Sequence, residues 1–422
     1  MDITLRFIGK VKEAHISLNG ITVIAGENSS GKTTIAKALY GSLSPFENLE
    51  RSIFDRKIQS MAIYAQEWFQ AANKKGNTGR RENIILTSLY LFGRRIPGRF
   101  KEFKLLNPDS DITEEFLIQA AKEYSRDRNP ITDASILSNE ATNNAIKAIN
   151  QAYARNDMDY AKLVFEQSLV GVFSNQVATF GNFGKSTIQL GETNLEFGKT
   201  NFSIQNFLAP SEYKVSTVVY LPASRFSHRD EDFLKGRLLK QLGSDSALLD
   251  LDFTLEQHES IRENQVEFSR LVDTIIKGHL ERTESGFVFV EDSHPSDQIA
   301  LDNVASGVLP FAYIGRLVMN GMIREDTIII IDEPEMNLHP EWQLQFARLL
   351  VFLSKKVGVR TVIISHSPYF IRAVEKTLAT EGNGVDGRFY LMKEQDKLFI
   401  SSEVTNSMKE IYTQLYRPFE EL

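Results

Sequence analysis

Eight residues near the amino terminus have the types and spacing that hold phosphate groups. Gly26-Glu27-Asn28-Ser29-Ser30-Gly31-Lys32-Thr33 fits the pattern G-x-x-x-x-G-K-[ST], in which glycines permit close backbone approach and successive amides face an anion at a helix start. Lys32 is expected to reach the β- and γ-phosphates of a nucleotide, and Thr33 to bind Mg²⁺. The alternative is a chance Gly/Ser turn. We predict that the nucleotide is bound by Gly26, Glu27, Asn28, Ser29, Ser30, Gly31, Lys32, Thr33 and Thr34.

A second candidate element is an apolar run that ends in two acids. Residues 328–331 are all isoleucine and precede Asp332 and Glu333. A carboxylate at the end of a buried strand holds Mg²⁺ directly or through water in P-loop enzymes, which is the role predicted for Asp332. Glu333 is placed to orient and deprotonate an attacking water. The alternative is the exposed acidic end of an ordinary strand.

Two further motifs offer hydrogen-bond donors. His366, in Ile364-Ser365-His366-Ser367-Pro368, follows an apolar run and is predicted to donate to a γ-phosphate, although a lone histidine is more often a capping or core residue. Ser306 and Gly307 precede an apolar helix predicted over 308–319 and offer a hydroxyl and free amides to an anion. Such a pair is otherwise an ordinary N-cap. The predicted catalytic residues are Glu333, His366 and Lys32, and the predicted metal ligands are Thr33 and Asp332.

The elements around these motifs predict an α/β fold. Apolar runs at 21–25, 327–331 and 361–364 are typical of parallel strands covered by helices on both faces. The P-loop lies between such a strand and a helix pattern over 31–42. We predict a P-loop α/β unit with a mixed sheet flanked by helices, an antiparallel β subdomain and a large helical insertion. Its parts are an N-terminal part at 1–45, the helical insertion at 46–184, and the β subdomain with the remainder of the α/β unit at 185–422.

Shorter patterns predict the remaining elements. Antiparallel strands are expected within 185–222, two helices between 231 and 280, a strand at 286–290, a hairpin over 387–404 and a last helix at the carboxyl end. The insertion has no sustained heptad repeat, so a long coiled coil is not expected.

Composition excludes several classes of protein. The 422 residues include no cysteine, which excludes disulfides, cysteine-ligated zinc, iron–sulfur clusters and thiol catalysis. The net charge of −7 means that any nucleic-acid contact needs a local basic patch. Neither a signal peptide nor an apolar stretch of membrane-spanning length is evident, so we expect a cytoplasmic protein.

In this order, the motifs resemble those of ABC-type ATPases, and of the SMC, RecF and OLD branch more than of transporter subunits. Ala305-Ser306-Gly307 is similar to the signature loop, Asn337-Leu338-His339-Pro340 to the "LHP" segment of OLD-like ATPases, and Ser365-His366-Ser367-Pro368 to their switch-histidine motif. Residues 220–225, Tyr-Leu-Pro-Ala-Ser-Arg, are also similar to a segment of this branch. The candidates for a Q-loop glutamine are Gln59, Gln66 and Gln70.

The resemblance implies an ABC-type P-loop ATPase head, in which the helix after Ser306 and Gly307 is the signature helix. It also implies ATP and Mg²⁺ as ligands and a homodimer in which two heads close on ATP. The signature serine of one head would then complete the site of the other. Stand-alone OLD-like ATPases of bacterial anti-phage systems, such as Septu, PARIS or retron-associated ATPases, control a separately encoded effector, often a nuclease. Only 56 residues follow His366, too few for the Toprim nuclease of OLD proteins. The alternatives are a RecF-like DNA-repair ATPase and a scaffold or transporter-associated ATPase.

A basic segment lies within the insertion. Residues 74–104 hold nine basic and two acidic side chains, with aromatic and aliphatic residues at 89–92 between them. Such a segment is expected either to neutralise the phosphates of a nucleic acid or to bind an acidic partner. The alternative is a solvated helical face.

Overall fold

The computed structural model describes residues 1–75, 82–124, 139–174, 176–178, 185–198, 202–207, 213–221, 232–244, 255–284 and 286–417. The chain divides into two compact units, of which the first combines 1–47 with 165–422 and the second is 48–164. The insertion expected at 46–184 includes all of the second unit. The two units are described separately below.

In the described part of the first unit, eleven strands form one sheet. Their order is β6-β5-β4-β1-β2-β14-β13-β3-β12-β11-β7. The bounds are β1 Asp2–Ile8, β2 Val11–Ser17, β3 Ile21–Ala25, β4 Ser186–Leu190, β5 Thr193–Phe197, β6 Phe202–Gln205, β7 Thr217–Leu221, β11 Thr327–Asp332, β12 Arg360–Ser365, β13 Gly387–Gln395 and β14 Leu398–Glu403.

The sheet is parallel at one end and largely antiparallel at the other. Strands β13, β3, β12, β11 and β7 run parallel in that order. Strands β2, β1, β4, β5 and β6 pair antiparallel. Of the antiparallel strands expected within 185–222, β4, β5 and β6 do pair antiparallel and extend the main sheet. The prediction is wrong for β7, which runs parallel to β11 at the other end of the sheet. The expected class, a mixed sheet flanked by helices, is confirmed.

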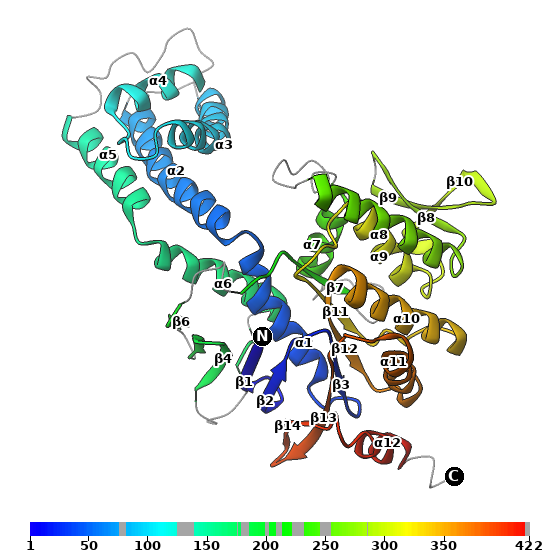
Figure 1. The fold of residues 1–422 in the computed structure, drawn as a ribbon. Coiled ribbons are helices and arrows are strands. Elements are labelled where there is room, and N and C mark those ends of the chain that lie inside the picture. Colours follow the sequence, from blue (N-terminus) through cyan, green and yellow to red (C-terminus); the bar gives the residue numbers. More distant parts are fainter. Residues whose placement is uncertain are drawn as a thin grey trace. The chain divides into compact units, whose positions relative to one another are not determined.

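Helices cover both faces of the parallel part, which explains why its strands are apolar throughout. Ile329 and Ile331 of β11 belong to the same buried core as Phe311, Phe346 and Phe370 from the helices of one face. The other face packs on the P-loop helix α1 (Lys32–Leu43). Figure 1 shows α1 on one side of the sheet and α10 and α11 on the other. The helices of the first face include α9 Leu309–Met319, α10 Pro340–Val357 and α11 Pro368–Glu381.

The remaining elements of the first unit lie beyond these layers. A three-stranded antiparallel sheet, β8 Gly278–Thr283, β9 Gly286–Glu291 and β10 His294–Ala300, packs through β8 against α9. The other helices are α7 Asp232–Leu242, α8 Leu255–Asp273, α12 Lys409–Tyr416 and two short 3₁₀ turns, Ser44–Asn48 and Leu301–Asn303. The expected helices within 231–280, the strand at 286–290, the closing hairpin and the last helix are confirmed.

The second unit is helical and has its own core. It contains α2 Leu49–Lys75, α3 Glu82–Leu106, α4 Glu114–Tyr124, α5 Asn139–Ala154 and the first part of α6 (Asp157–Phe173). The rings of Phe69 and Phe92 stack with centroids 4.1 Å apart inside this core. The three Q-loop candidates, Gln59, Gln66 and Gln70, all lie on α2.

Much of the described basic segment is used within the helical unit. Arg99 pairs with Glu123 at 2.8 Å, and Lys101 pairs with Asp55 at 2.6 Å. Lys104 is buried and donates to the Ser110 carbonyl at 2.7 Å. These three cations stabilise the unit itself. The side chains of the segment's first basic residues, at 74, 75, 80 and 81, lie outside the described residues.

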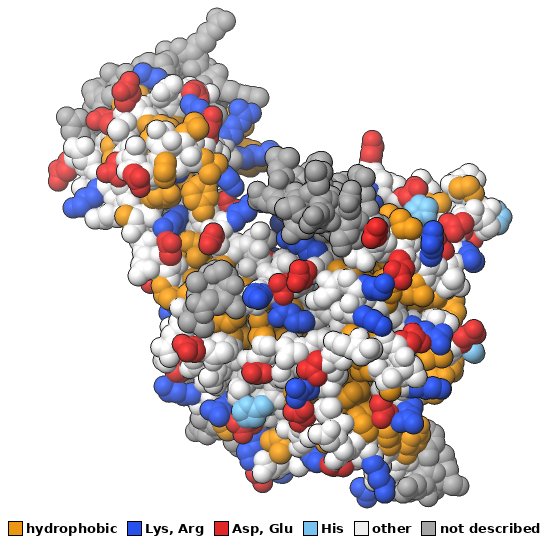
Figure 2. Space-filling view, viewed as in Figure 1, with side chains coloured by type: hydrophobic (Ala, Val, Ile, Leu, Met, Phe, Trp, Pro, Cys, Tyr) orange, Lys and Arg blue, Asp and Glu red, His pale blue; other side chains and the backbone are white. Residues whose placement is uncertain are grey.

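Charges are mixed on the surface. On the face that Figure 2 shows, acidic and basic side chains are interspersed. No helix among the described residues is long and apolar enough to cross a membrane.

Candidate nucleotide-binding site

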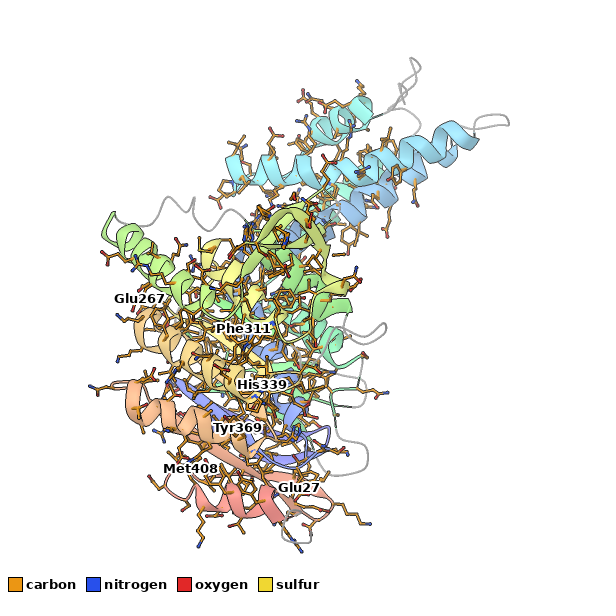
Figure 3. The ribbon with its side chains drawn as sticks, turned by 90° about the vertical axis from the view of Figure 1, so that its right-hand side faces the viewer. Glu27, Glu267, Phe311, His339, Tyr369 and Met408 are labelled. Carbon is orange, nitrogen blue, oxygen red and sulfur yellow. The ribbon has the colours of Figure 1, made fainter. Side chains whose placement is uncertain are left out.

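Three parallel strands bring the chemistry-bearing loops to one edge of the sheet. Ala25 of β3 is in register with Ser365 of β12, and Ile364 is in register with Asp332 of β11. The loops after these strands therefore begin side by side, although they lie far apart in sequence. The loops that carry the P-loop motif, the acidic pair and His366 all start at this edge, which is where open α/β sheets place their ligands. Figure 3 labels Glu27 in the first loop, His339 in the second and Tyr369 just after the third.

The P-loop backbone needs its glycines. A Cβ on Gly26 would lie 2.9 Å from Ser30 Oγ and 3.0 Å from Met392 Cβ, so a larger residue would displace the loop. Gly31 caps the amino end of α1 at φ 86°, and Ser29 also has a positive φ of 63°. Left-handed backbone in a turn before a helix directs successive amides into one concavity that suits an anion. The predicted phosphate-binding loop thus has the required local geometry.

Lys32 is folded against this loop. Its Nζ donates to the carbonyls of Gly26 at 2.8 Å and Glu27 at 2.6 Å. Burial lowers the pKa of the Lys32 ammonium, and the charges of Glu333 and Asp332 raise it. The ammonium therefore lies at the same edge as the acidic pair.

The two predicted metal ligands are joined directly. Thr33 Oγ1 donates to Asp332 Oδ1 at 3.3 Å, and the hydroxyl of Tyr220 donates to Asp332 Oδ2 at 3.2 Å. Burial raises the pKa of the Asp332 carboxyl to about 6, against the effect of these two hydrogen bonds. A hydroxyl and a carboxylate beside a phosphate loop fit Mg²⁺, which takes few protein oxygens and keeps its other positions for phosphates and water. No cluster of three or more His, Cys, Asp or Glu residues among the described residues forms a separate metal site.

Glu333 and His366 face each other. The oxygen Glu333 Oε1 is 3.3 Å from His366 Nδ1. Glu333 has a positive φ of 52°, and its amide donates to the Ile364 carbonyl at 2.8 Å. This bond fixes the backbone of Glu333 to β12, while its side chain keeps 24% of its surface exposed. The carboxylate can therefore reach water, as a general base must.

A second acid, Glu335, was missed by the sequence analysis. Its Oε1 accepts hydrogen bonds from Ser365 Oγ and from the amides of His366 and Ser367. Burial raises the pKa of the Glu335 carboxyl, and these hydrogen bonds lower it. The available signal was an acid two positions after Glu333, in Asp-Glu-Pro-Glu, where only the first two acids were assigned chemistry.

Ser306 and Gly307 lie in the turn just before α9, whose N-cap is Val308. Ser306 is half-buried and forms no hydrogen bond with other described residues. A Cβ on Gly307 would lie 2.7 Å from the carbonyl oxygen of Asn337, in the loop after β11. The signature loop therefore packs closely on the loop that follows the acidic pair. Thr34 is half-buried on α1, whereas Glu27 and Asn28 are exposed. Of the similar segment at 220–225, residues 222–225 lie outside the described residues.

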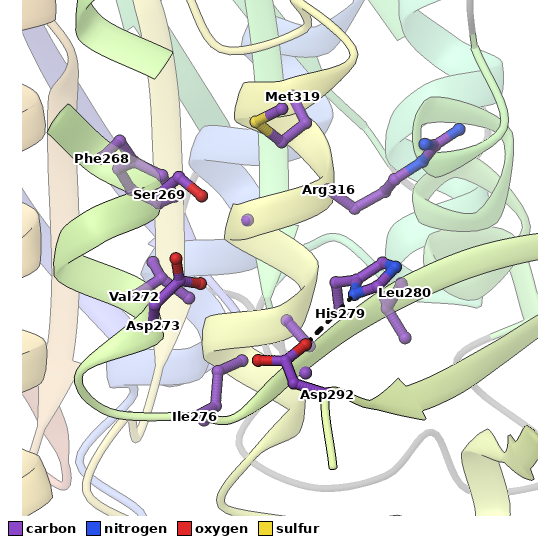
Figure 4. Close-up of a pocket in the computed structure, with 13 residues that line it drawn as sticks. Phe268, Ser269, Val272, Asp273, Ile276, His279, Leu280, Asp292, Arg316 and Met319 are labelled. Carbon is purple, nitrogen blue, oxygen red and sulfur yellow. Dashed lines mark ion pairs between the residues drawn. The ribbon is translucent and has the colours of Figure 1, made fainter. Parts of the chain in front are cut away.

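A separate pocket lies behind the signature helix. It has a volume of about 280 Å³ and is lined by α8, β8 and α9, including Phe268, Ile276, Ala312 and Gly315. Figure 4 shows His279 paired with Asp292 at its rim, where the His279 Nδ1 to Asp292 Oδ1 distance is 3.8 Å. None of the predicted site residues lines it.

Known proteins that are similar to this chain include one family and three remotely similar solved structures. The SMC head domain from Thermotoga maritima is 11% identical to the chain with a TM-score of 0.36, and the match covers 96% of this chain and 98% of that chain. An SMC head bound to the C-winged helix domain of ScpA is 12% identical with a TM-score of 0.39, and the match covers 97% of this chain and 98% of that chain. An SMC head with an extended coiled coil, bound to the C-terminal domain of ScpA derived from Pyrococcus furiosus, is 12% identical with a TM-score of 0.33, and the match covers 97% of this chain and 98% of that chain. Likeness this remote does not carry over what those heads bind. The model of the AAA ATPase domain family matches residues 3–371, and the chain belongs to that family.

Proposed function

We propose that the chain is an ATP-hydrolysing molecular switch. The observation that carries this is the arrangement at one sheet edge of the P-loop, the Thr33–Asp332 pair and Glu333. The amides of 26–31 and Lys32 bind the phosphates, and Thr33 and Asp332 hold Mg²⁺. When bound, Mg²⁺ neutralises charge on the phosphate oxygens as it develops during transfer.

The acidic pair and the histidine divide the remaining work. Glu333, with an accessible carboxylate, orients the attacking water and accepts its proton at a carboxylate oxygen. His366 lies within 3.3 Å of Glu333 and donates a hydrogen bond to the γ-phosphate from the ring nitrogen that faces it. Lys32 adds positive charge on the same side.

Two copies of the chain are proposed to close on ATP. The support is Ser306, whose hydroxyl has no hydrogen-bond partner among the described residues and which lies at the start of α9. A hydroxyl and helix amides at this position suit the phosphate of a nucleotide held by a second head. Hydrolysis then removes the contacts that favoured the closed pair, so the ligand shifts the population of open and closed states.

The switch is proposed to control a separately encoded effector, such as a nuclease or toxin, in anti-phage defence. The support is the resemblance of the motifs around Ser306, His339 and His366 to those of stand-alone OLD-like ATPases. A RecF-like role on DNA predicts instead that the full chain binds duplex DNA in the absence of any partner.

The hydrolysis assignment is tested with Glu333→Gln, which keeps size and hydrogen bonding but removes the base. Loss of a general base typically costs 10²–10⁴-fold, so single-turnover hydrolysis is expected to fall by about that range while ATP binding persists. Hydrolysis near the wild-type rate would refute Glu333 as the base. Glu394→Gln, an exposed acid at the end of β13, is the matched control.

The dimer is tested on the Glu333→Gln background by sedimentation with and without Mg-ATP. Ser306→Arg places bulk and charge where the second nucleotide would dock. We expect normal folding and ATP binding but no ATP-dependent dimer. An unchanged dimer would refute the two-head site.

The partner is tested by affinity purification of Glu333→Gln from its native host, because slow hydrolysis holds the ATP-bound state. An effector retained with ATP and released with Lys32→Ala supports the defence role. Recovery of DNA alone would favour the RecF-like alternative.

A further inference from the structure

The carboxylate of Glu335 connects two of the loops that form the site. Its Oε1 accepts from Ser365 Oγ at 2.8 Å and from the amides of His366 and Ser367, both at 3.1 Å. Glu335 follows β11, whereas all three donors follow or end β12. The residue is only 7% exposed. One buried oxygen therefore fixes the loop that carries the switch histidine to the loop that carries the acidic pair.

The imidazole of His366 lies between two acids. Its Nδ1 is 3.3 Å from Oε1 of Glu333 and 3.3 Å from Oε1 of Glu335. Neither contact is a hydrogen bond, and Nδ1 is buried without a hydrogen-bond partner in the described structure. Buried polar atoms are costly to leave unpaired. Oε2 of Glu335 is likewise buried without a hydrogen-bond partner in the described structure, so the Glu335 carboxylate keeps acceptor capacity for Nδ1.

The two acids differ in how firmly they are held. Three donors from the backbone and Ser365 fix Oε1 of Glu335, and moving this oxygen would break all three hydrogen bonds. The side chain of Glu333 is 24% exposed, and no hydrogen bond to its carboxylate is seen among the described residues. Glu335 is thus a fixed acceptor, and Glu333 is a movable one.

We propose that Glu335 is a positioning residue for hydrolysis, which offers Nδ1 of His366 a fixed acceptor and so leaves Glu333 free to act on water. When the ring bonds to Glu335, its other nitrogen has a defined direction, because the partner of one ring nitrogen fixes the orientation of the ring. When the ring bonds to Glu333, the base is restrained. The proposal rests on the proposed function, since it acts through the roles assigned to Glu333 and His366.

The first test is Glu335→Gln in the full chain. The amide oxygen of glutamine can still accept hydrogen bonds from the backbone donors, so the connection between the loops is kept. Because a neutral amide oxygen is a weaker acceptor than a carboxylate, Nδ1 of His366 should then bond to Glu333 instead and restrain the base. We expect the Kd for a non-hydrolysable ATP analogue to stay within about twofold, and kcat to fall about 10–100-fold, the cost of misplacing a catalytic group slightly. An unchanged kcat would overturn the proposal.

The second test repeats the substitution in a His366→Ala background, followed by single-turnover hydrolysis. If Glu335 acts through the imidazole, Glu335→Gln is expected to change the rate by less than about twofold once the ring is absent. An equal loss in both backgrounds would mean that Glu335 only supports the loops, and would overturn the proposal.

Glu335→Asp keeps the charge and keeps the test decisive if the glutamine variant fails to fold. If the glutamine variant folds, we expect the aspartate variant to retain more activity than it does. If the glutamine variant does not fold, we expect Glu335→Asp to lower kcat in the wild-type background but not in the His366→Ala background. Glu394→Gln is the control for removing an acid. Failure of this proposal can be distinguished from failure of the proposed function. If the Glu333→Gln variant still hydrolyses ATP, the assignment of Glu333 as the base is refuted, whatever the Glu335 variants show.

Discussion

The hydroxyl of Thr33 donates a hydrogen bond to Asp332 across 3.3 Å, and so joins two residues 299 positions apart in the chain. Thr33 is the second residue of helix α1, and Asp332 is the last residue of β11. Because the parallel register of β3, β12 and β11 sets where both lie, the predicted metal site depends on correct assembly of the sheet centre. Substitutions in these two elements should therefore affect nucleotide binding together.

Lys32→Ala is expected to weaken ATP binding by at least about tenfold. The substitution removes the cation next to the phosphate loop, and a charge-assisted contact contributes about 1.5–3 kcal/mol. Equilibrium binding of a fluorescent ATP analogue measures the effect. Lys37→Ala, on the same helix α1, controls for loss of a lysine. Equal affinities for the two variants would contradict the role of Lys32.

Asp332→Asn is expected to stabilise the protein in the absence of metal and nucleotide. Burial raises the pKa of Asp332 from 3.8 to about 6. A raised folded-state pKa means that the carboxyl contributes stability below pH 3.8, which is lost as the pH rises through about 6. At pH 8 the variant should therefore gain about 3 kcal/mol in the free energy of unfolding. The gain should disappear near pH 4.

Denaturant unfolding in EDTA at several pH values measures this gain. Asp297→Asn, an exposed aspartate in β10, serves as the control and should show no such trend. A gain for Asp332→Asn that does not change with pH would contradict the explanation. Mg²⁺-dependent nucleotide binding should meanwhile be lost in Asp332→Asn, because the amide no longer carries the charge.

The sequence predicted which residues gather at the candidate site better than it predicted the hydrogen bonds that connect them. Lys32, Thr33, Asp332 and Glu333 fall within local patterns whose spacing is set by one loop or one strand end. Glu335 escaped because its three donors, at Ser365, His366 and Ser367, come from another strand, and that register is not written in any local pattern.

The same limit applied to the basic segment and the sheet. Lys101 pairs with Asp55, which lies on another helix and so outside the local sequence pattern. Lys104 donates to the Ser110 carbonyl, a backbone acceptor that the sequence pattern does not show. The antiparallel strands were expected as a subdomain because strand patterns do not specify neighbours, whereas β4 in fact pairs with β1. Long-range pairing is decided by packing rather than by local propensity.

Gly307→Ala is expected to destabilise the fold and weaken the ATP-dependent dimer. Its Cβ would lie 2.7 Å from the Asn337 carbonyl oxygen, so the two loops must separate, at a cost of about 1–3 kcal/mol. Gly315→Ala on α9 is the matched control, because nothing lies within 4 Å of its Cβ. That change should be neutral or stabilising by up to about 1 kcal/mol. Thermal unfolding of both variants makes the comparison, and equal melting temperatures would contradict the close approach.

Charge reversal should separate structural from exposed cations in the helical unit. Lys101→Glu places an acid beside Asp55, which now lies 2.6 Å from the lysine Nζ, and should lower the free energy of unfolding by about 1 kcal/mol. Arg94→Glu changes an exposed side chain on the same helix and should leave stability within about 0.5 kcal/mol. If nucleic acid binds this unit, Arg94→Glu should lower the slope of log Kd against log salt by about 0.9 for a phosphate contact on duplex DNA.

The helical unit leaves the first unit after residue 47 and returns at Phe165. The rings of Phe46 and Phe165, on either side of this excursion, have centroids only 5.1 Å apart, and Ser44 Oγ and Ser168 Oγ are 3.2 Å apart. The chain thus leaves and re-enters the first unit at two adjacent points that contact each other, as in domains that tolerate exchange of an inserted module. A flexible linker of a few residues is therefore expected to join residue 47 to residue 165, so that the first unit can be produced without the helical unit. The same insertion point can accept a helical unit of different length and binding specificity.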